Sequence, residues 1–79
     1  MVRPTRVTNS IRALRFAHGE LTQAELAERV GVTRQTIIAI EQGRYSPSLE
    51  MAFQIARVFA VALDSVFQYD DSDAGRSKS

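Results

Sequence analysis

The middle of this 79-residue chain carries apolar residues at the spacing of a short amphipathic helix. Leu26, Ala27 and Val30 fall on one face of a helix drawn over residues 23–30, and the charged residues between them fall on the opposite face. Gly31 follows the last apolar position, where helices often end in a left-handed conformation that a residue without a Cβ adopts at little cost. The pattern predicts a helix with one buried face that ends at Val30.

A second helix is predicted after a very short turn, over residues 34–42. Ile37 and Ile40 face inward in it, and Gly43 follows its end. The small side chain of Ala27 lets the two helix backbones approach closely where they cross. We interpret residues 23–43 as a helix-turn-helix, the motif whose second helix presents side chains to base edges in the major groove of DNA.

Both helices begin at residues suited to capping. Thr22 is followed three residues later by Glu25, the spacing at which each side chain accepts a hydrogen bond from the other residue's backbone N–H. Thr33 offers a cap for the second helix, and Ser48 offers one for a later helix over residues 49–59. Local signals therefore define where these three helices start.

Two further helices complete a predicted all-α fold of five helices. The first, capped by Thr8 or Asn9 and ending near Ala17, supports the motif without reading DNA. The last, over residues 63–67, starts poorly because Ala62 cannot cap it. The residues expected to face inward from the three helices outside the motif are Ile11, Leu14, Phe16, Leu49, Ala52, Phe53, Ile55, Ala56, Phe59, Leu63, Val66 and Phe67.

Composition narrows the function classes. The chain has no cysteine and one histidine, which excludes disulfides and thiolate metal sites, so we expect no metal, no cofactor and no enzyme. It has no signal-peptide pattern and no run of about 20 apolar residues, so we expect a cytoplasmic protein without membrane contact. Although the net charge is only +1, residues 1–44 carry seven arginines against four glutamates, or +3, and residues 45–79 carry −2. The basic half contains the helix-turn-helix, which suits contact with DNA.

A run of small, apolar and glutamine positions in fixed register carries a family resemblance. The residues are Thr22, Gln23, Leu26, Ala27, Val30, Gly31, Val32, Thr33, Gln35, Thr36, Ile37, Ile40, Glu41, Gly43, Tyr45, Ser46, Pro47, Ser48 and Leu49. With them, the chain resembles the Cro and lambda-repressor class of helix-turn-helix proteins, the xenobiotic-response-element family, over roughly residues 9–69. The resemblance implies a compact five-helix lambda-repressor-like DNA-binding domain, with the helix-turn-helix at helices 2 and 3.

The same resemblance implies function. Proteins of this class are transcriptional regulators, commonly repressors, and act as symmetric homodimers on two half-sites of a palindromic double-stranded operator. It also implies an ion pair between Arg15 and Glu41 and a phosphate contact by Gln23. Around this domain, residues 1–8 are expected to be a flexible N-terminal arm and residues 70–79 a disordered C-terminal tail.

Side-chain chemistry suggests which residues of the second motif helix read bases. Arg34 can take O6 and N7 of guanine together, and Gln35 can pair with N6 and N7 of adenine. Ala39 can contact a thymine methyl group, and Ile38 either does the same or belongs to the core or an interface. The residues expected to contact phosphates are Gln23, Thr33, Thr36, Gln42 and Arg44.

The dimer surface and the function class both leave alternatives. We expect Val66, Phe67 and Tyr69 at the dimer interface, although Phe67 could instead fill the core with Tyr69 packed over it. The competing function is that of an antitoxin, a protein-binding module that neutralises a toxin partner. A metal-dependent enzyme using the aspartates at 70, 71 and 73 is disfavoured, because these residues read as a solvated acidic tail.

Overall fold

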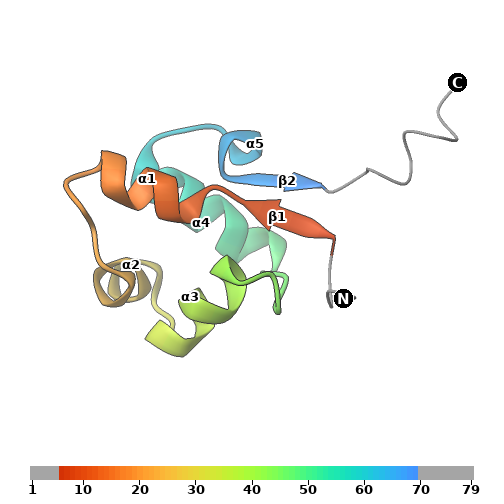
Figure 1. The fold of residues 1–79 in the computed structure, drawn as a ribbon, viewed down its shortest axis with the longest axis horizontal. Helices are drawn as coiled ribbons and strands as arrows, with labels where there is room; N and C mark the ends of the chain where they lie inside the picture. The colour runs from red at the N-terminus through yellow and green to blue at the C-terminus, as the bar shows by residue number, and fades with distance from the viewer. Residues whose placement is uncertain (1–5, 70–79) are drawn as a thin grey trace, which may run out of the picture.

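The structure, a computed structural model, describes residues 6–69. In chain order its elements are β1 (Val7–Asn9), α1 (Ile11–Ala17), α2 (Gln23–Val30), α3 (Arg34–Glu41), α4 (Leu49–Phe59), α5 (Leu63–Val66) and β2 (Phe67–Tyr69). Figure 1 shows α4 in the middle of the molecule, with α2 and α3 on one side of it and α5 and β2 on the other. The helix-turn-helix therefore packs against the central helix, α4.

Each motif helix is capped as the sequence predicts. The Thr22 hydroxyl accepts from the Glu25 backbone N–H at 3.0 Å, and the Glu25 carboxylate accepts from the Thr22 N–H at 2.9 Å. Gly31 ends α2 with φ of +85°, in the left-handed region that favours glycine. The Thr33 hydroxyl then caps α3. These local contacts set the short turn between α2 and α3 and confirm the predicted helix-turn-helix.

One hydrophobic core joins all five helices. Its fully buried side chains come from every helix: Ile11, Leu26, Ile37, Ile40, Ile55, Phe59 and Val66. Ala27 is also buried, at the position where a small residue was expected between α2 and α3. Arg15 is the one charged residue that is buried within the described chain, and its partners are given below.

A two-stranded antiparallel sheet corrects the all-α prediction. Val7 pairs with Tyr69, and Asn9 pairs with Phe67. Val7 and Thr8, expected in a flexible arm, thus belong to β1, while residues 1–5 and the tail 70–79 lie outside the described part of the chain. Because Phe67 begins β2, α5 ends one residue earlier than predicted, and α3 likewise ends at Glu41.

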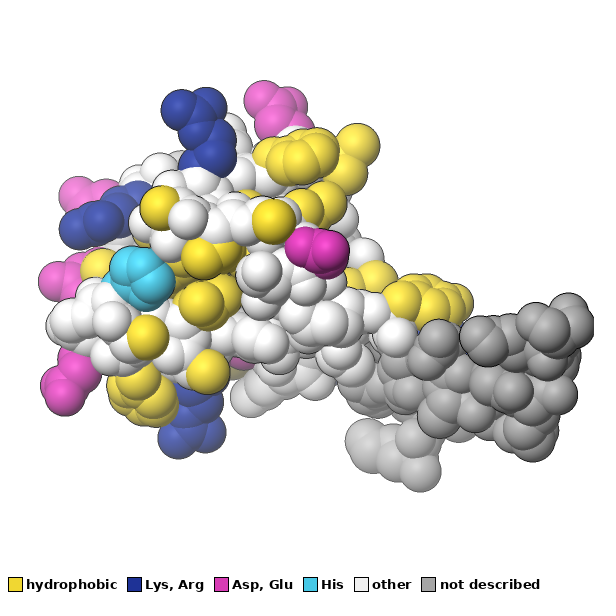
Figure 2. All heavy atoms as spheres, turned by 90° about the horizontal axis from the view of Figure 1, so that it is seen from above, with side chains coloured by type: hydrophobic (Ala, Val, Ile, Leu, Met, Phe, Trp, Pro, Cys, Tyr) yellow, Lys and Arg dark blue, Asp and Glu magenta, His cyan; other side chains and the backbone are white. Residues whose placement is uncertain are grey.

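Three aromatic or apolar side chains expected to face inward are exposed instead. Phe16 is 55% exposed, Leu49 68% and Phe53 49%. On α4 the buried stripe consists of Ala52, Ile55, Ala56 and Phe59, and Leu49 and Phe53, four residues apart, lie together beside this stripe on the helix surface. On the face seen in Figure 2, hydrophobic side chains accordingly form several exposed groups between charged ones.

Candidate nucleic-acid interface

The N-terminal turn of α3 presents polar side chains to solvent. Arg34 and Gln35 are both exposed, and the side chain of neither makes a hydrogen bond or ion pair with residues 6–69. Ile38 and Ala39 lie further along the same helix and are half-buried. The two residues expected to make bidentate base contacts are thus free to do so, whereas the two expected to meet methyl groups are partly covered.

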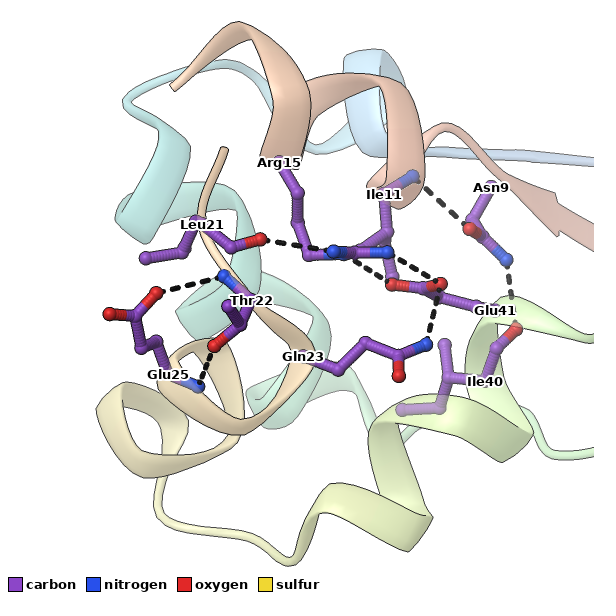
Figure 3. A network of polar contacts seen from close by, with 9 residues as sticks. All are labelled: Asn9, Ile11, Arg15, Leu21, Thr22, Gln23, Glu25, Ile40 and Glu41. Carbon is purple, nitrogen blue, oxygen red and sulfur yellow. Dashed lines mark hydrogen bonds and ion pairs between the residues drawn. The ribbon is translucent and has the colours of Figure 1, made fainter. Parts of the chain in front are cut away.

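The other end of α3 is held by a buried ion pair to α1. The Arg15 guanidinium donates from Nε to one oxygen of Glu41 at 2.8 Å and from its second terminal nitrogen to the other oxygen at 3.2 Å (Figure 3). Its remaining terminal nitrogen donates to the backbone carbonyl of Leu21 at 3.0 Å. The side chains of Arg15 and Glu41 are only 10% and 9% exposed, so this bidentate ion pair is largely shielded from solvent.

Gln23 connects α2 to the same carboxylate. Its amide nitrogen donates to the Glu41 oxygen Oε1 at 3.1 Å, beside the Arg15 contact (Figure 3). An amide NH2 group carries two hydrogens, so one remains for a second acceptor such as a phosphate oxygen. Gln23 therefore joins α2 to the pair of Arg15 and Glu41 and keeps one amide hydrogen for the phosphate contact that the resemblance implies.

Asn9 makes a further connection that the sequence analysis missed. Its side-chain nitrogen donates to the Ile40 carbonyl at 2.8 Å, and its side-chain oxygen accepts from the Ile11 N–H at 3.1 Å. The second contact satisfies the first N–H of α1, but the N-cap position itself is Ser10, whose side chain makes no capping hydrogen bond, so the predicted cap at Thr8 or Asn9 is corrected to the next residue. The first contact joins residues 31 positions apart and leaves no local signal.

The other residues expected to contact phosphates lie at the two ends of α3. The hydroxyl groups of Thr33 and Thr36 are 3.0 Å apart, at its N-terminus. Beyond its C-terminus, Arg44 donates from Nε to the Gln42 side-chain oxygen at 2.8 Å, and both side chains are exposed. These positions flank Arg34 and Gln35, as phosphate contacts flank base contacts in helix-turn-helix complexes.

The residues expected at the dimer interface separate into two kinds. Val66 is fully buried in the core of its own chain, so its side chain cannot contact a second chain, and this part of the prediction is wrong. Phe67 is half-buried against the core, and Tyr69 is 64% exposed. Leu49 and Phe53, exposed on α4, are apolar surface that the sequence analysis placed inside.

One carboxyl group has a shifted pKa. The pKa of Glu25 is lowered, first because its carboxylate accepts the Thr22 backbone N–H, then through the Thr22 side chain, with a smaller contribution from Arg29. Since hydrogen bonding favours the charged form, this shift belongs to the cap of α2. It does not mark a catalytic acid.

Other site types find no support in residues 6–69. No group of three or more histidine, cysteine or acidic side chains within this range could hold a metal ion. The aspartates at 70, 71 and 73 lie outside it. No helix within the range is long and apolar enough to cross a membrane.

A scan against protein families matches the helix-turn-helix model over residues 11–66. An HTH-type transcriptional regulator of Methanocaldococcus jannaschii is 49% identical over 65 residues, which cover 82% of this chain and 97% of that protein. One from Methanothermobacter thermautotrophicus is 60% identical over 55 residues, covering 68% of this chain and 80% of that protein. The Bacillus subtilis regulator YgzD is 42% identical over 65 residues, with coverage of 82% and 97%.

Solved structures share the fold. The crystal structure of a proposed DNA-binding protein from Bacteroides fragilis matches with a TM-score of 0.69 at 26% identity, over 78% of this chain and 98% of that one. A hypothetical transcription factor from Neisseria matches with a TM-score of 0.66 at 24% identity, over 84% and 75%. This second likeness concerns the fold alone.

The fold and the similarity to these proteins place the chain in the class of DNA-binding transcriptional regulators, and the exposed N-terminal turn of α3 agrees with this class. Within that class, the chain belongs to the helix-turn-helix family of the Cro and lambda-repressor type.

Proposed function

We propose that this protein is a sequence-specific repressor that acts in the cytoplasm and reads the major groove of double-stranded DNA with α3. The observation that carries the proposal is the contrast between exposed Arg34 and Gln35 and the fixed C-terminal end of the same helix. A helix held at one end can insert the other into the groove without losing its orientation. Arg34 then takes a guanine and Gln35 an adenine, with Ile38 and Ala39 against thymine methyl groups.

Phosphate contacts complete the proposed docking. Gln23 offers its second amide hydrogen at the start of α2, and Thr33, Thr36, Gln42 and Arg44 bracket α3. Such contacts set the register of the protein on the duplex but carry no sequence information.

We further propose that the protein acts as a homodimer on a palindromic operator. Support comes from the exposed apolar surface around Leu49, Phe53, Phe67 and Tyr69, which includes a groove lined by both α4 and β2. A single domain contacts few base pairs, and a second copy one helical turn away, about 34 Å, doubles the recognised sequence.

Selection of bound duplexes from a random pool tests the proposal, with the parent compared to Arg34→Ala and Arg44→Ala. The parent should select a palindrome with half-sites about one turn apart. Arg34→Ala should lose about 1–3 kcal/mol of discrimination at one base pair of each half-site. Arg44→Ala should weaken all duplexes alike and keep the preference.

Two results would count against this function. Recovery of the same sequences by Arg34→Ala would mean that α3 does not read the groove through this residue. Recovery of nothing above background by the parent, with co-purification of a second chain, would favour the antitoxin alternative.

A further inference from the structure

A groove on the described surface lies between α1 and the two motif helices. It has a volume of about 690 Å³, and α1 contributes Arg12 and Phe16 to its lining. Gln23, Arg34 and Gln42, three of the residues proposed above to contact DNA, line the same groove. A DNA strand that meets α3 would therefore pass beside α1, to which the sequence assigns only a supporting role.

The charges of this groove fall into a neutralised part and a free part. Arg15 and Glu41 pair with each other and are almost fully buried, so their charges cancel. Arg12 and Arg34 are exposed and have no acidic partner within ion-pair distance among residues 6–69. Glu20 is the remaining acidic lining residue. The accessible charge of the groove is thus positive, as a polyanion requires.

Phe16 gives Arg12 a fixed place at the rim. The Arg12 guanidinium carbon lies 5.7 Å from the centre of the Phe16 ring, and the Arg15 guanidinium carbon lies at the same 5.7 Å. A guanidinium group within about 6 Å of an aromatic face is attracted to it. The contact accounts for a phenylalanine that is 55% exposed at a position where the core does not need it. An arginine held in this way loses less conformational entropy when it binds.

We propose that Arg12 binds a backbone phosphate of the same duplex that α3 reads, and that Phe16 positions its guanidinium for this contact. The inference rests on the proposed function, because the ligand is the operator duplex. It adds α1 to the proposed DNA-binding surface, so that a DNA strand is contacted by α1 as well as by the helix-turn-helix. The contact is independent of base sequence.

Titration of binding against salt tests the role of Arg12. The probes are one selected operator duplex and one unrelated duplex, followed by fluorescence anisotropy. Arg12→Ala should weaken binding to both by about tenfold at low salt, and should reduce the slope of log affinity against log salt by about 0.9. Arg57→Ala, which removes an exposed arginine from a separate groove beside Arg29, is the matched control and should change neither quantity.

A double-mutant cycle tests the role of Phe16. Phe16→Leu keeps an apolar side chain but removes the ring, and should weaken binding in the parent while having almost no effect in the Arg12→Ala background. An equal loss in both backgrounds would overturn the positioning role. Urea titration of each variant separates a binding defect from a folding defect.

The outcomes distinguish this inference from the function on which it rests. If the parent binds the selected duplex and Arg12→Ala matches Arg57→Ala in affinity and salt slope, the Arg12 contact is wrong and the proposed function stands. If the parent binds neither duplex, both are wrong.

Discussion

The N-terminal and C-terminal ends of α3 are built in opposite ways. At the N-terminal end, Arg34 and Gln35 extend into solvent without partners in the described chain. At the C-terminal end, the Ile40 carbonyl and the Glu41 carboxylate receive hydrogen bonds from β1, α1 and α2. Arg34 and Gln35, the residues proposed to read DNA, can therefore vary without disturbing the contacts that fix the helix.

Burial explains why the C-terminal end of α3 should tolerate fewer substitutions than the N-terminal end. A carboxylate that is 9% exposed must keep its partners, because a buried charge without them loses hydration and receives nothing in return. Arg34, at the exposed N-terminal end of the helix, is hydrated in the folded protein and needs no protein partner for its charge. The comparison predicts a large loss of stability on substitution of Glu41, an intermediate loss at Asn9, and small losses at solvated positions.

Glu41→Ala should produce the largest loss of stability. It leaves the buried Arg15 guanidinium with the Leu21 carbonyl as its one hydrogen-bond acceptor among residues 6–69, and it also removes the acceptor of the Gln23 amide. Breaking one side of a buried pair costs about 3 kcal/mol. The free energy of unfolding, measured by urea titration, should fall by that amount.

Glu28→Ala provides the control for this loss. Glu28 is an exposed glutamate on α2 whose side chain has no partner among residues 6–69, and its removal should change the free energy of unfolding by no more than about 0.5 kcal/mol. Equal effects of the two substitutions would mean that the pair does not hold α3.

Asn9→Ala should have an intermediate effect. It removes the donor to the Ile40 carbonyl and the acceptor of the Ile11 N–H, for a loss of about 1–2 kcal/mol. Asn9→Asp keeps the acceptor but turns a carboxylate oxygen toward the Ile40 carbonyl. Urea titration of both variants therefore separates the contribution of the hydrogen bond to the Ile11 N–H from that of the hydrogen bond to the Ile40 carbonyl.

If the connection matters, Asn9→Asp should be destabilised at least as much as Asn9→Ala. If Asn9→Asp were as stable as the parent, the hydrogen bond to the Ile11 N–H would account for the whole contribution of Asn9. Gln68→Ala, an exposed change in the neighbouring strand, gives the background for substitutions in this sheet.

The sequence was sufficient where structure is set locally. The bounds of α2 and α4 are those predicted, because each helix carries a capping residue before its first turn. Gly31 likewise ends α2 in the conformation that its lack of a side chain favours. The start of α3 was predictable for the same reason, since Arg34 and Gln35 follow the Thr33 cap directly.

Contacts between distant segments left no comparable pattern. The strands have three residues each, and Thr8 pairs with Gln68, sixty positions away. A stretch of three residues is too short to show the alternation by which strands are recognised. The spacing of apolar residues in α4 predicted the buried residues Ala52, Ile55, Ala56 and Phe59, but not that the neighbouring Leu49 and Phe53 stay exposed.

The smallest effect is expected at Glu25, the exposed counterpart of Glu41. Its folded pKa is lowered by the Thr22 hydrogen bonds, below the unfolded value of about 4.3. A depressed acid contributes stability above its unfolded pKa and loses it as the pH falls through the folded pKa. Glu25→Gln should therefore be slightly less stable than the parent at neutral pH, and the difference should vanish in acid.

Urea titration of the parent and Glu25→Gln at several pH values between about 7 and 3 measures this difference, while the carboxyl carbon signal of Glu25 gives its pKa directly. Glutamine can still accept the Thr22 N–H, so the comparison isolates the charge from the hydrogen bond. Glu28→Gln corrects for the loss of one negative charge from the same helix. A difference that persisted in acid would assign the contribution of Glu25 to the geometry of its capping hydrogen bonds and not to its charge. Exposed Glu25 and buried Glu41 would then differ only in the hydrogen bonds that they accept.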